Sequence, residues 1–482
     1  MTKLKTFFFA ASALTLLGVS ACKDPSDGTG GGSAALPEAP FVEGGVSLIL
    51  SPDKLDIKVK AVTSDGNPVV IEGCNETTLA NDTETELHAT GTTVILKGKI
   101  IELYCNGTSS DNNQLTALNV QGLSALQVLS CSYNQLTALN VQGLTALKEL
   151  GCYKNQLTAL DVQGLTALKV LSCSYNQLTA LNVQGLTALK ELNCVANQLT
   201  ALNVQGLTAL KELVCWGNQL NALNVQGLTA LQVLNCFGNR LTELNVQGLT
   251  ALQGLNCWGN RLTALNVQGL TALKELLCGE NQLNALNVQG CTALQELGCY
   301  KNQLTALNVQ GLTTLQRLDC EGNQLTALDV QGLPALKELD CGGNQLTVLN
   351  VQGCTALKEL KCYGNQLTEL NVQGCASLQE MDCQRNQLTA LNVQGCTALR
   401  QLICGGNQLT AQAFTKLFDD LPQRVDSDNA KCVLYTEQTG VIEGNHTDFS
   451  APPDLAAAFN NAKTVKNWKM YKYNGNWPWE EI

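Results

Sequence analysis

Apolar residues recur along most of the chain with a period of 21 residues. The repeated unit reads Leu-x-x-Leu-x-Cys-x-x-Asn-Gln-Leu-Thr-Ala-Leu-Asn-Val-Gln-Gly-Leu-Thr-Ala, and its first copy spans residues 126–146. A cysteine returns at every step from Cys131 to Cys404, and an asparagine follows each of them three residues later. An earlier copy begins at Ile100 and carries five extra residues, so residues 100–409 hold fifteen copies.

The short segment around each cysteine is predicted to be a β-strand with one buried face. In Leu129-Ser130-Cys131-Ser132 the side chains alternate, so Leu129 and Cys131 point to one side and the two serines to the other. One unit cannot bury its leucines by itself, whereas stacked units bury them in a continuous core. With strands about 4.8 Å apart, fifteen stacked units would form a parallel sheet roughly 65–70 Å long.

The period and the spacing of the leucines match the leucine-rich-repeat pattern, with cysteine in place of the third leucine of the strand. We therefore expect an α/β-type leucine-rich-repeat solenoid dominated by a parallel β-sheet. It should have fifteen coils, a 21-residue period and little helix on the convex side. The length alone would suggest about three domains, but the repeats overrule that estimate.

Two segments outside the repeats are expected to cover the open ends of the solenoid. Residues 41–99 are predicted to form a β-rich N-terminal cap, since alternating apolar and polar residues mark strands at 54–61 and 92–96. Residues 410–482 are predicted to form a mixed α/β C-terminal cap.

The C-terminal cap is expected to contain helices at 412–421 and 453–463 and a strand at 431–435. It ends in an aromatic tail that contains Trp468, Tyr471, Tyr473, Trp477 and Trp479. We interpret the tail as part of the cap, and a separate ligand site there is the alternative.

Two polar positions of the repeat differ in what they tolerate. The position of Asn134 is asparagine in every copy, which indicates that both the donor and the acceptor of its amide are used, in a buried ladder bonded to backbone. At the position of Asn140 two copies carry aspartate instead, Asp161 and Asp329. A hydrogen-bond acceptor is therefore sufficient there, as in an Asx turn or a helix N-cap. Gly143 and its equivalents are expected to need a backbone conformation or a close approach that a Cβ would hinder.

The chain contains 22 cysteines, a number that in a secreted protein suggests disulfides. Four cysteines instead stand where other copies have leucine, so cysteine behaves here as a small buried hydrophobe; they are Cys291, Cys354, Cys375 and Cys396. The spacings of 21 or 8 residues and the presence of only two histidines argue against a metal site. We expect nearly all ladder cysteines to be free thiols.

The N-terminus has the features of a bacterial lipoprotein signal. Lys3 and Lys5 precede a short apolar run, and the run ends in Val-Ser-Ala-Cys at Cys22, which resembles a lipobox. We predict that residues 1–21 are a cleaved signal peptide and that residues 22–40 are a flexible tether with a lipidated Cys22. A plain cleaved secretory signal is the alternative.

The residues after Cys22 favour an outer-membrane lipoprotein that is exposed at the cell surface. Lys23 stands where an aspartate would favour retention in the inner membrane, and Lys23-Asp24 matches in part the export signal of surface lipoproteins. The lipid anchor is then the only contact with the membrane that we expect.

The net charge of −11 argues against nucleic acid as a partner, because no basic stripe opposes the repulsion. Two histidines, both outside the repeats, form no obvious catalytic dyad, and no nucleophile elbow, phosphate loop or zinc motif is present. We therefore expect a monomeric binding protein without a cofactor, a metal ion or an enzymatic activity.

The copies are nearly identical except at the outward positions of the strand and the residues that follow it. Aromatic and apolar residues gather at these positions, where a recognition surface would vary over a constant frame. The candidate aromatic patch consists of Tyr153, Val214, Trp216, Phe237, Trp258, Leu277, Tyr300 and Tyr363.

Toward the C-terminus the same positions become acidic. The candidate acidic patch consists of Asp319, Glu321, Glu338, Asp340 and Asp382. Solvated surface charge without a binding role explains such a cluster equally well.

The 21-residue unit with its cysteine resembles the repeats of the internalins, a family of bacterial adhesion proteins, above all those of the internalin J type. The resemblance covers residues 100–409 and rests on both the repeat length and the position of the cysteine. Internalins of Gram-positive bacteria usually end in wall-sorting or wall-binding modules, whereas this chain has a lipobox. It therefore looks like an internalin-like lipoprotein of a Gram-negative bacterium.

The resemblance implies attachment to host cells or other bacteria, biofilm formation and virulence, with a protein ligand on the target cell. Two other functions stay open. A row of tryptophan and tyrosine side chains can also stack on sugar rings, which would make the protein a glycan-binding surface lipoprotein. A scaffold whose length matters more than any patch is the third possibility.

Overall fold

The computed structural model describes residues 38–108, 114–438, 440, 442–475 and 478–482. The predicted signal peptide, Cys22 and nearly all of the predicted tether lie outside the described residues, as does Trp477. No helix in the described part of the chain is long and apolar enough to span a membrane.

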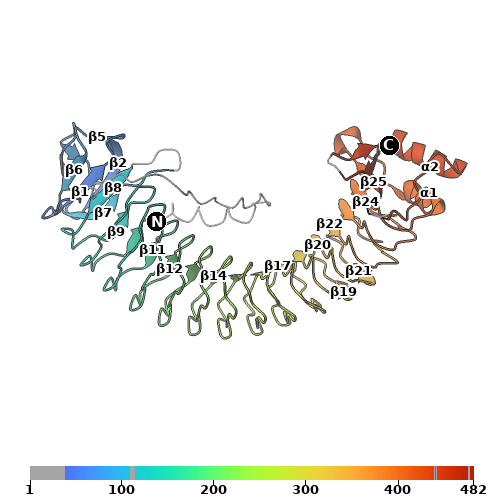
Figure 1. Cartoon of the computed structure of the whole chain (residues 1–482), viewed down its shortest axis with the longest axis horizontal. Coiled ribbons are helices and arrows are strands. Elements are labelled where there is room, and N and C mark those ends of the chain that lie inside the picture. Colours follow the sequence, from blue (N-terminus) through green and yellow to red (C-terminus); the bar gives the residue numbers. More distant parts are fainter. Residues whose placement is uncertain (1–37, 109–113, 439, 441, 476–477) are drawn as a thin grey trace. The chain divides into compact units, whose positions relative to one another are not determined.

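Each coil contributes one short strand to a parallel sheet, and the strands line one side of the stacked coils (Figure 1). The first strand is β7, Ile100–Tyr104. The others are β9 (Val128–Ser130), β10 (Glu149–Gly151), β11 (Val170–Ser172), β12 (Glu191–Asn193), β13 (Glu212–Val214), β14 (Val233–Asn235), β15 (Gly254–Asn256), β16 (Glu275–Leu277), β17 (Glu296–Gly298), β18 (Arg317–Asp319), β20 (Glu338–Asp340), β22 (Glu359–Lys361), β23 (Glu380–Asp382) and β24 (Gln401–Ile403).

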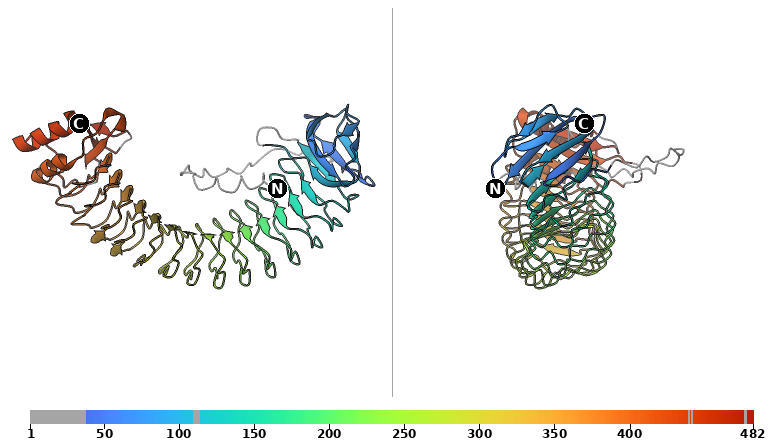
Figure 2. Two further views of the ribbon diagram at one scale, coloured as in Figure 1. Left: turned by 180° about the vertical axis from the view of Figure 1, so that it is seen from behind. Right: turned by 90° about the vertical axis from the view of Figure 1, so that its left-hand side faces the viewer.

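The register of the sheet repeats from coil to coil. Leu129 pairs with Leu150, which pairs in turn with Leu171, and the same leucine meets its equivalent along the sheet. Seen along the stack, the coils overlay one another (Figure 2). This arrangement confirms the predicted solenoid with its 21-residue period.

The return segments of the coils contain almost no regular structure. Three short strands occur there: β8 (Leu115–Asn119), β19 (Ala327–Asp329) and β21 (Val348–Asn350). No helix lies between residues 114 and 409 in the described structure, as the sequence predicts for the convex side.

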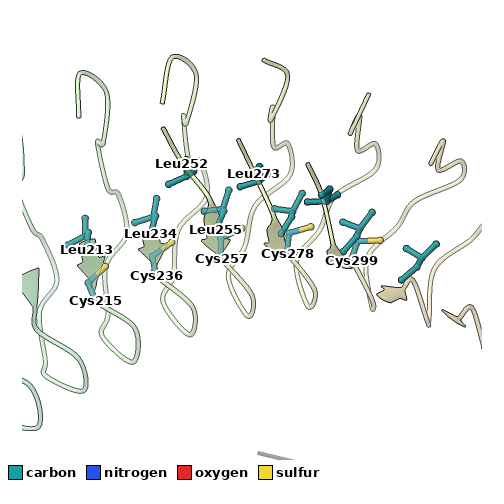
Figure 3. Packing of buried hydrophobic residues seen from close by; sticks show 14 of the residues in the cluster. Leu213, Cys215, Leu234, Cys236, Leu252, Leu255, Cys257, Leu273, Cys278 and Cys299 are labelled. Atoms are coloured by element: carbon teal, nitrogen blue, oxygen red, sulfur yellow. The ribbon is translucent and has the colours of Figure 1, made fainter. Parts of the chain in front are cut away.

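The apolar positions of the unit form one continuous core between the strands and the return segments. In the first regular coil Leu129, Leu136, Val141 and Leu144 are fully buried, and their equivalents along the stack are equally inaccessible. Figure 3 shows Cys215, Cys236 and Cys257 at the same place in successive coils, beside the strand leucines. The core therefore has the composition of the repeat, with Cys291, Cys354, Cys375, Cys396 and Met381 as replacements for leucine in particular coils.

The ladder cysteines are buried free thiols. Some of the buried cysteines donate a weak S–H hydrogen bond to the backbone of a neighbouring coil, as in the ladder residue Cys341, whose Sγ donates to the Lys361 carbonyl (3.4 Å). Cys354, at one of the leucine positions, donates likewise to the Val330 carbonyl (3.2 Å). Burial raises the pKa of Cys257 to about 12, so its thiol stays protonated at neutral pH. The cysteines thus behave as the small hydrophobes that the exchange with leucine indicates.

The invariant asparagine joins each coil to the one before it. Asn260 Nδ2 donates to the carbonyls of Cys257 (3.0 Å) and Cys236 (3.1 Å), and its Oδ1 accepts from the Leu241 amide (3.0 Å). The same bonds recur from Asn134 to Asn407. The predicted buried ladder is confirmed, and both ends of the amide are used.

The position of Asn140 forms an Asx turn. Its Oδ1 accepts from the amide of Gln142 (3.0 Å), and the carboxylates of Asp161 and Asp329 accept from the equivalent amides at 3.0 and 2.9 Å. The glycine three residues on, Gly143, has φ +81° and open space where a Cβ would stand. Of the two reasons that we considered for this glycine, the left-handed conformation is therefore the one that applies.

The N-terminal cap is β-rich and pairs with the first coil. Its strands are β1 (Gly45–Leu50), β2 (Asp56–Thr63), β3 (Val69–Glu72), β4 (Thr78–Leu79), β5 (Thr85–His88) and β6 (Thr93–Lys97). Strand β2 lies antiparallel to β7, with Ala61 opposite Leu103, and β1 pairs with β8. The edge of the parallel sheet is thereby covered.

The C-terminal cap extends the parallel sheet and adds two helices. Its elements are α1 (Ala411–Asp420), the 3-10 turn η1 (Asp426–Asp428), β25 (Lys431–Thr436), α2 (Pro453–Thr464), β26 (Lys469–Tyr473) and β27 (Glu480–Glu481). The two helices and the first strand begin and end within about one residue of the ranges that the sequence predicts. Strand β25 pairs with β24, β26 pairs with β25, and β27 pairs antiparallel with β26.

The asparagine ladder continues into the C-terminal cap at a position outside the period. Asn445 accepts from the Leu409 amide (2.8 Å) and donates to the carbonyls of Cys404 and Leu434 (both 2.9 Å). It does for the last coil what each repeat asparagine does for the coil before it. The sequence analysis missed this residue because no 21-residue spacing marks it.

Titration of thiols in residues 38–482 under denaturing, non-reducing conditions should find nearly all 21 cysteines free. The folded protein should react slowly, because the ladder thiols are buried and protonated. A low thiol count in the denatured protein would show that disulfides hold the coils together instead.

Replacing asparagine by aspartate at the two polar positions of one coil should change the free energy of unfolding by very different amounts. Asn260→Asp sets carboxylate oxygen against two carbonyls and should lower the free energy of unfolding by at least about 3 kcal/mol. Asn266→Asp, in the Asx turn of the same coil, should change it by less than about 0.5 kcal/mol. Equal effects of the two substitutions in chemical denaturation would refute the ladder's role.

Candidate binding surface

The strand side of the coils carries four outward positions in each repeat. In the first regular coil these are Val128 and Ser130, on either side of the buried Leu129, followed by Ser132 and Tyr133. Ser132 itself is buried, as are Ser174 and Val195 at the same position, so this position reaches the surface only where a coil carries a larger side chain. Because the strands are in register, each position forms a column of side chains along the sheet. Every residue of the two predicted patches lies in one of these columns.

The column of Ser132 holds a row of aromatic rings in mutual contact. The rings of Trp216 and Phe237 stack with centroids 4.7 Å apart and planes 12° from parallel. Trp258 continues the row, with its ring 5.5 Å from that of Phe237 and tilted by 46°. The three rings are half-buried, so they are less exposed than strand alternation alone suggests, and part of each stays accessible.

Small residues make room for the isolated tyrosines of the same column. A Cβ added to Gly279 would lie 2.6 Å from the ring of Tyr300, and one added to Gly342 would lie 2.5 Å from the ring of Tyr363. Each tyrosine therefore lies over the glycine of the coil before it. Likewise Tyr153 contacts a ring of the preceding coil, that of Tyr133, at 4.9 Å.

The column of Tyr133 has a left-handed backbone in every coil from Tyr133 to Gly406. Many coils place glycine there, such as Gly217 with φ +66°, but Tyr133, Lys154 and Tyr175 adopt φ values of 56°, 52° and 53°. Such a conformation costs a residue other than glycine about 1 kcal/mol or more. Tyr133, Lys154 and Tyr175 thus stand at positions where glycine would make the fold more stable.

These left-handed residues extend the aromatic row toward the N-terminal cap. Lys154 Nζ lies 4.7 Å from the ring centre of Tyr133 and 5.8 Å from that of Tyr175, and Tyr175 meets the ring of Trp216 at 6.0 Å. Tyr175 is 45% exposed. Tyr175 and Lys154 are not part of the patch predicted from the sequence, although the alternation of glycine with large residues at their position could have indicated them.

Val214 and Leu277 flank the row from the neighbouring column, at the ends of β13 and β16. Both are half-buried, and each has asparagine opposite on an adjacent strand. We call the continuous surface of Tyr175, Trp216, Phe237 and Trp258 the aromatic row.

Of the predicted acidic residues, Asp319, Glu338 and Asp340 line a shallow hollow of about 290 Å³ on the strands β18, β20 and β22. Asp319 and Asp340 stand opposite each other on adjacent strands and accept from the amides of Glu321 (3.2 Å) and Gly342 (3.1 Å). Tyr363 donates its hydroxyl to Glu321 Oε1 at 2.5 Å. The predicted residues are thus brought together, apart from Asp382, which lies two strands beyond Asp340 and accepts from Gln384. We call this hollow the acidic hollow.

The positive charges of the acidic hollow are already paired with glutamates. Arg317 bonds to Glu338 (3.2 Å) and lies 3.7 Å from Glu296, and Lys361 bonds to Glu359 (2.5 Å). Among the described residues, Asp319 and Asp340 form no ion pair. Burial raises the pKa of Asp319 and Asp382, and burial with the repulsion of Asp319 and Glu321 raises the pKa of Asp340 to about 7.

Oxygen atoms of Asp319, Glu321 and Asp340 lie within 4.8 Å of one another, a spacing that an oxygen-coordinated divalent cation could use. Their hydrogen bonds to backbone amides and to Tyr363 occupy part of this acceptor set. Nothing besides proximity identifies these residues as a metal site.

A second hollow, also of about 290 Å³, lies where the strand side meets the C-terminal cap. It is lined by Tyr363, Gln384, Arg385, Ile403, Val433, Tyr473 and Trp479. Ile403 and Val433 are paired on β24 and β25, and the ring of Trp479 lies 6.0 Å from that of Tyr471. The aromatic tail, interpreted from the sequence as cap, also forms this wall, and we call the space the aromatic hollow.

The strand side of the described coils offers groups that suit binding. Both histidines lie in the caps, where His88 pairs with Glu76 (2.7 Å) and His446 Nε2 lies 2.6 Å from the Asp448 carbonyl oxygen. The carboxylates of the acidic hollow lie on an open face that does not exclude water. Half-buried rings beside carboxylates suit a partner that brings apolar and cationic groups.

Comparison with known proteins finds no match among family models or curated sequences. Among solved structures, the functional domain of InlJ from Listeria monocytogenes, which includes a cysteine ladder, is 28% identical over 80% of this chain and 75% of its own, with a TM-score of 0.58. A leucine-rich-repeat protein of Leptospira interrogans is 30% identical over 62% of this chain and 83% of its own, with a TM-score of 0.56.

A third similar structure is YopM from Yersinia pestis, a leucine-rich effector protein, which is 26% identical over 64% of this chain and 84% of its own, with a TM-score of 0.52. The three likenesses support the predicted fold, and the cysteine ladder is a feature that the chain shares with InlJ.

Asp340→Asn should stabilise the protein only above acidic pH. A carboxyl whose pKa rises from 3.8 unfolded to about 7 folded costs almost nothing below pH 3.8, its cost grows between pH 3.8 and about 7, and it is constant above that. The variant should therefore melt nearly as the wild type does near pH 4 and be more stable by up to about 4 kcal/mol at pH 8. Asp329→Asn, in an Asx turn that accepts either residue, is the control, and a pH-independent effect of Asp340→Asn would contradict the assignment.

Proposed function

The chain belongs to the leucine-rich-repeat proteins, and on that basis we propose that it is a surface-anchored adhesion protein. It binds protein partners on host cells or other bacteria through the strand side of its coils. The observation that carries the proposal is the aromatic row, a continuous ridge of half-buried rings on the one face that varies between otherwise constant coils. Tryptophan and tyrosine contribute more than other residues to the binding energy of protein interfaces.

The packing of the rings favours a protein over a glycan. A sugar stacks on a free ring face, but the faces of Trp216 and Phe237 that turn toward each other are used in their mutual stack. What stays accessible of the rings forms a ridge, flanked by the apolar side chains of Val214 and Leu277. Such a ridge suits the apolar side chains of a partner, so glycan binding is the second candidate and not the first.

The left-handed residues support a binding role over a purely mechanical one. A scaffold that needs only length would lose nothing with glycine at Tyr133, Lys154 and Tyr175, and it would gain stability. Instead these positions carry large side chains that extend the aromatic row. A partner that contacts them would account for the retained strain.

The proposal includes anchoring by a lipid at Cys22 in the outer membrane, with the coils exposed at the cell surface. Its support is the lipobox-like sequence and the residues that follow it. Attachment, biofilm formation and virulence are the processes in which such a protein would act.

Replacement of the row should abolish binding to cells. Purified residues 38–482 should bind host cells or companion bacteria, and Trp216/Phe237/Trp258→Ala should weaken that binding at least about tenfold. Protease treatment of the target cells should remove the binding, whereas glycosidase treatment should not. The matched control is Gln226/Gln247/Gln268→Ala, on the return side of the same three coils.

Equal binding by the row variant and the control, with both correctly folded by circular dichroism, would contradict the proposal. Binding that glycosidase removes and protease does not would replace it with the glycan function.

A further inference from the structure

The strand side holds two neighbouring hollows of opposite character in its C-terminal half. The acidic hollow presents carboxylates, and the aromatic hollow presents apolar and aromatic walls. Tyr363 lines the aromatic hollow and donates its hydroxyl to Glu321, whose amide donates to Asp319 in the lining of the acidic hollow. The two hollows therefore neighbour each other on the strand side.

The distance between the hollows follows from the register of the sheet. Asp340, Lys361, Asp382 and Ile403 occupy the same position on four successive strands. Asp340 and Ile403 are thus three strands apart, about 14 Å at the usual strand spacing. An extended polypeptide spans this distance in about four residues.

We infer that the two hollows bind an extended polypeptide segment that places an arginine or lysine in the acidic hollow and a large apolar side chain in the aromatic hollow. The inference rests on the proposed function, because it takes the partner to be a protein, and it names the chemistry of the part of the partner that docks here.

Charge complementarity selects a cationic group for the acidic hollow. Arg317 and Lys361 are paired with glutamates, whereas Asp319 and Asp340 lie opposite each other without an ion-pair partner in the described structure. An arginine side chain can bond to two carboxylate oxygens at once and would offset their repulsion. Both carboxylates are half-buried, so water screens the attraction less than it would between fully exposed charges.

The second hollow selects an apolar group and fixes the order of the two side chains. Ile403, Val433 and Trp479 provide apolar walls. Arg385 lines the same hollow, with its guanidinium bonded to Gln438 (3.0 Å), and it would repel a second cation. The cation therefore enters the acidic hollow and the apolar side chain enters the aromatic one.

The probe is a fluorescently labelled nine-residue glycine–serine peptide with arginine at its third position and phenylalanine at its seventh. We expect saturable binding to residues 38–482 in fluorescence anisotropy. Asp319→Asn/Asp340→Asn and Trp479→Ala should each weaken the binding about tenfold, equivalent to about 1.4 kcal/mol. Ile403→Ser serves as a second variant of the aromatic hollow if Trp479→Ala perturbs the cap.

Three controls make the assay specific. Asp161→Asn/Asp329→Asn removes the same two charges from Asx turns on the return side and should leave binding unchanged. A peptide with glutamate in place of arginine, and one with arginine and phenylalanine adjacent, should bind at least about tenfold more weakly.

Peptide binding that is weakened neither by the variants of the acidic hollow nor by those of the aromatic hollow would overturn the inference. The absence of any peptide binding would overturn it as well. Calcium binding that the Asp319→Asn/Asp340→Asn variant loses, without any peptide binding, would assign the acidic hollow to a metal ion instead. The peptide assay does not involve the aromatic row, so it can fail while cell binding still depends on Trp216, Phe237 and Trp258. Loss of the proposed function would appear in the cell assay alone.

Discussion

The structure depends on how each coil satisfies the backbone groups that its tight turns bury. The strand ends in a turn whose carbonyls face the core, and a buried carbonyl or amide without a partner costs about 1–3 kcal/mol. One asparagine side chain solves the problem in every coil, as Asn260 does for Cys236, Cys257 and Leu241. Because the bonds cross from coil to coil, the same residue also sets the stacking.

A frame that is fixed by one buried ladder leaves the strand side free to vary. None of the ladder bonds uses an outward side chain, so the outward columns can hold rings, carboxylates or glycine without affecting the stack. Their geometry is nevertheless cooperative between coils, since Tyr300 needs Gly279 before it and Phe237 stacks on Trp216. The surface therefore functions as rows that run across several coils, and it is at this scale that a partner would recognise it.

The sequence was sufficient to predict the features that all copies of the repeat share. The period, the buried leucines, the two-ended use of Asn134 and the acceptor at Asn140 follow from comparing the copies with one another, and the helices of the C-terminal cap follow from their apolar spacing. Features that depend on contact between particular coils could not be predicted in this way. Asn445 continues the ladder outside the period, and the half-burial of the rings arises from stacking that no single unit shows. The aromatic hollow needs the cap folded against the last coils.

Binding along the aromatic row places a protein partner on the strand side of the coils. Photo-crosslinking detects that contact, with a photoreactive amino acid at Tyr175, the most exposed ring of the row, and in a second protein at Gln247 on the return side. After irradiation on target cells, we expect polypeptide adducts from position 175 and none above background from position 247. Adducts from position 247 alone, or equally from both positions, would contradict binding along the aromatic row.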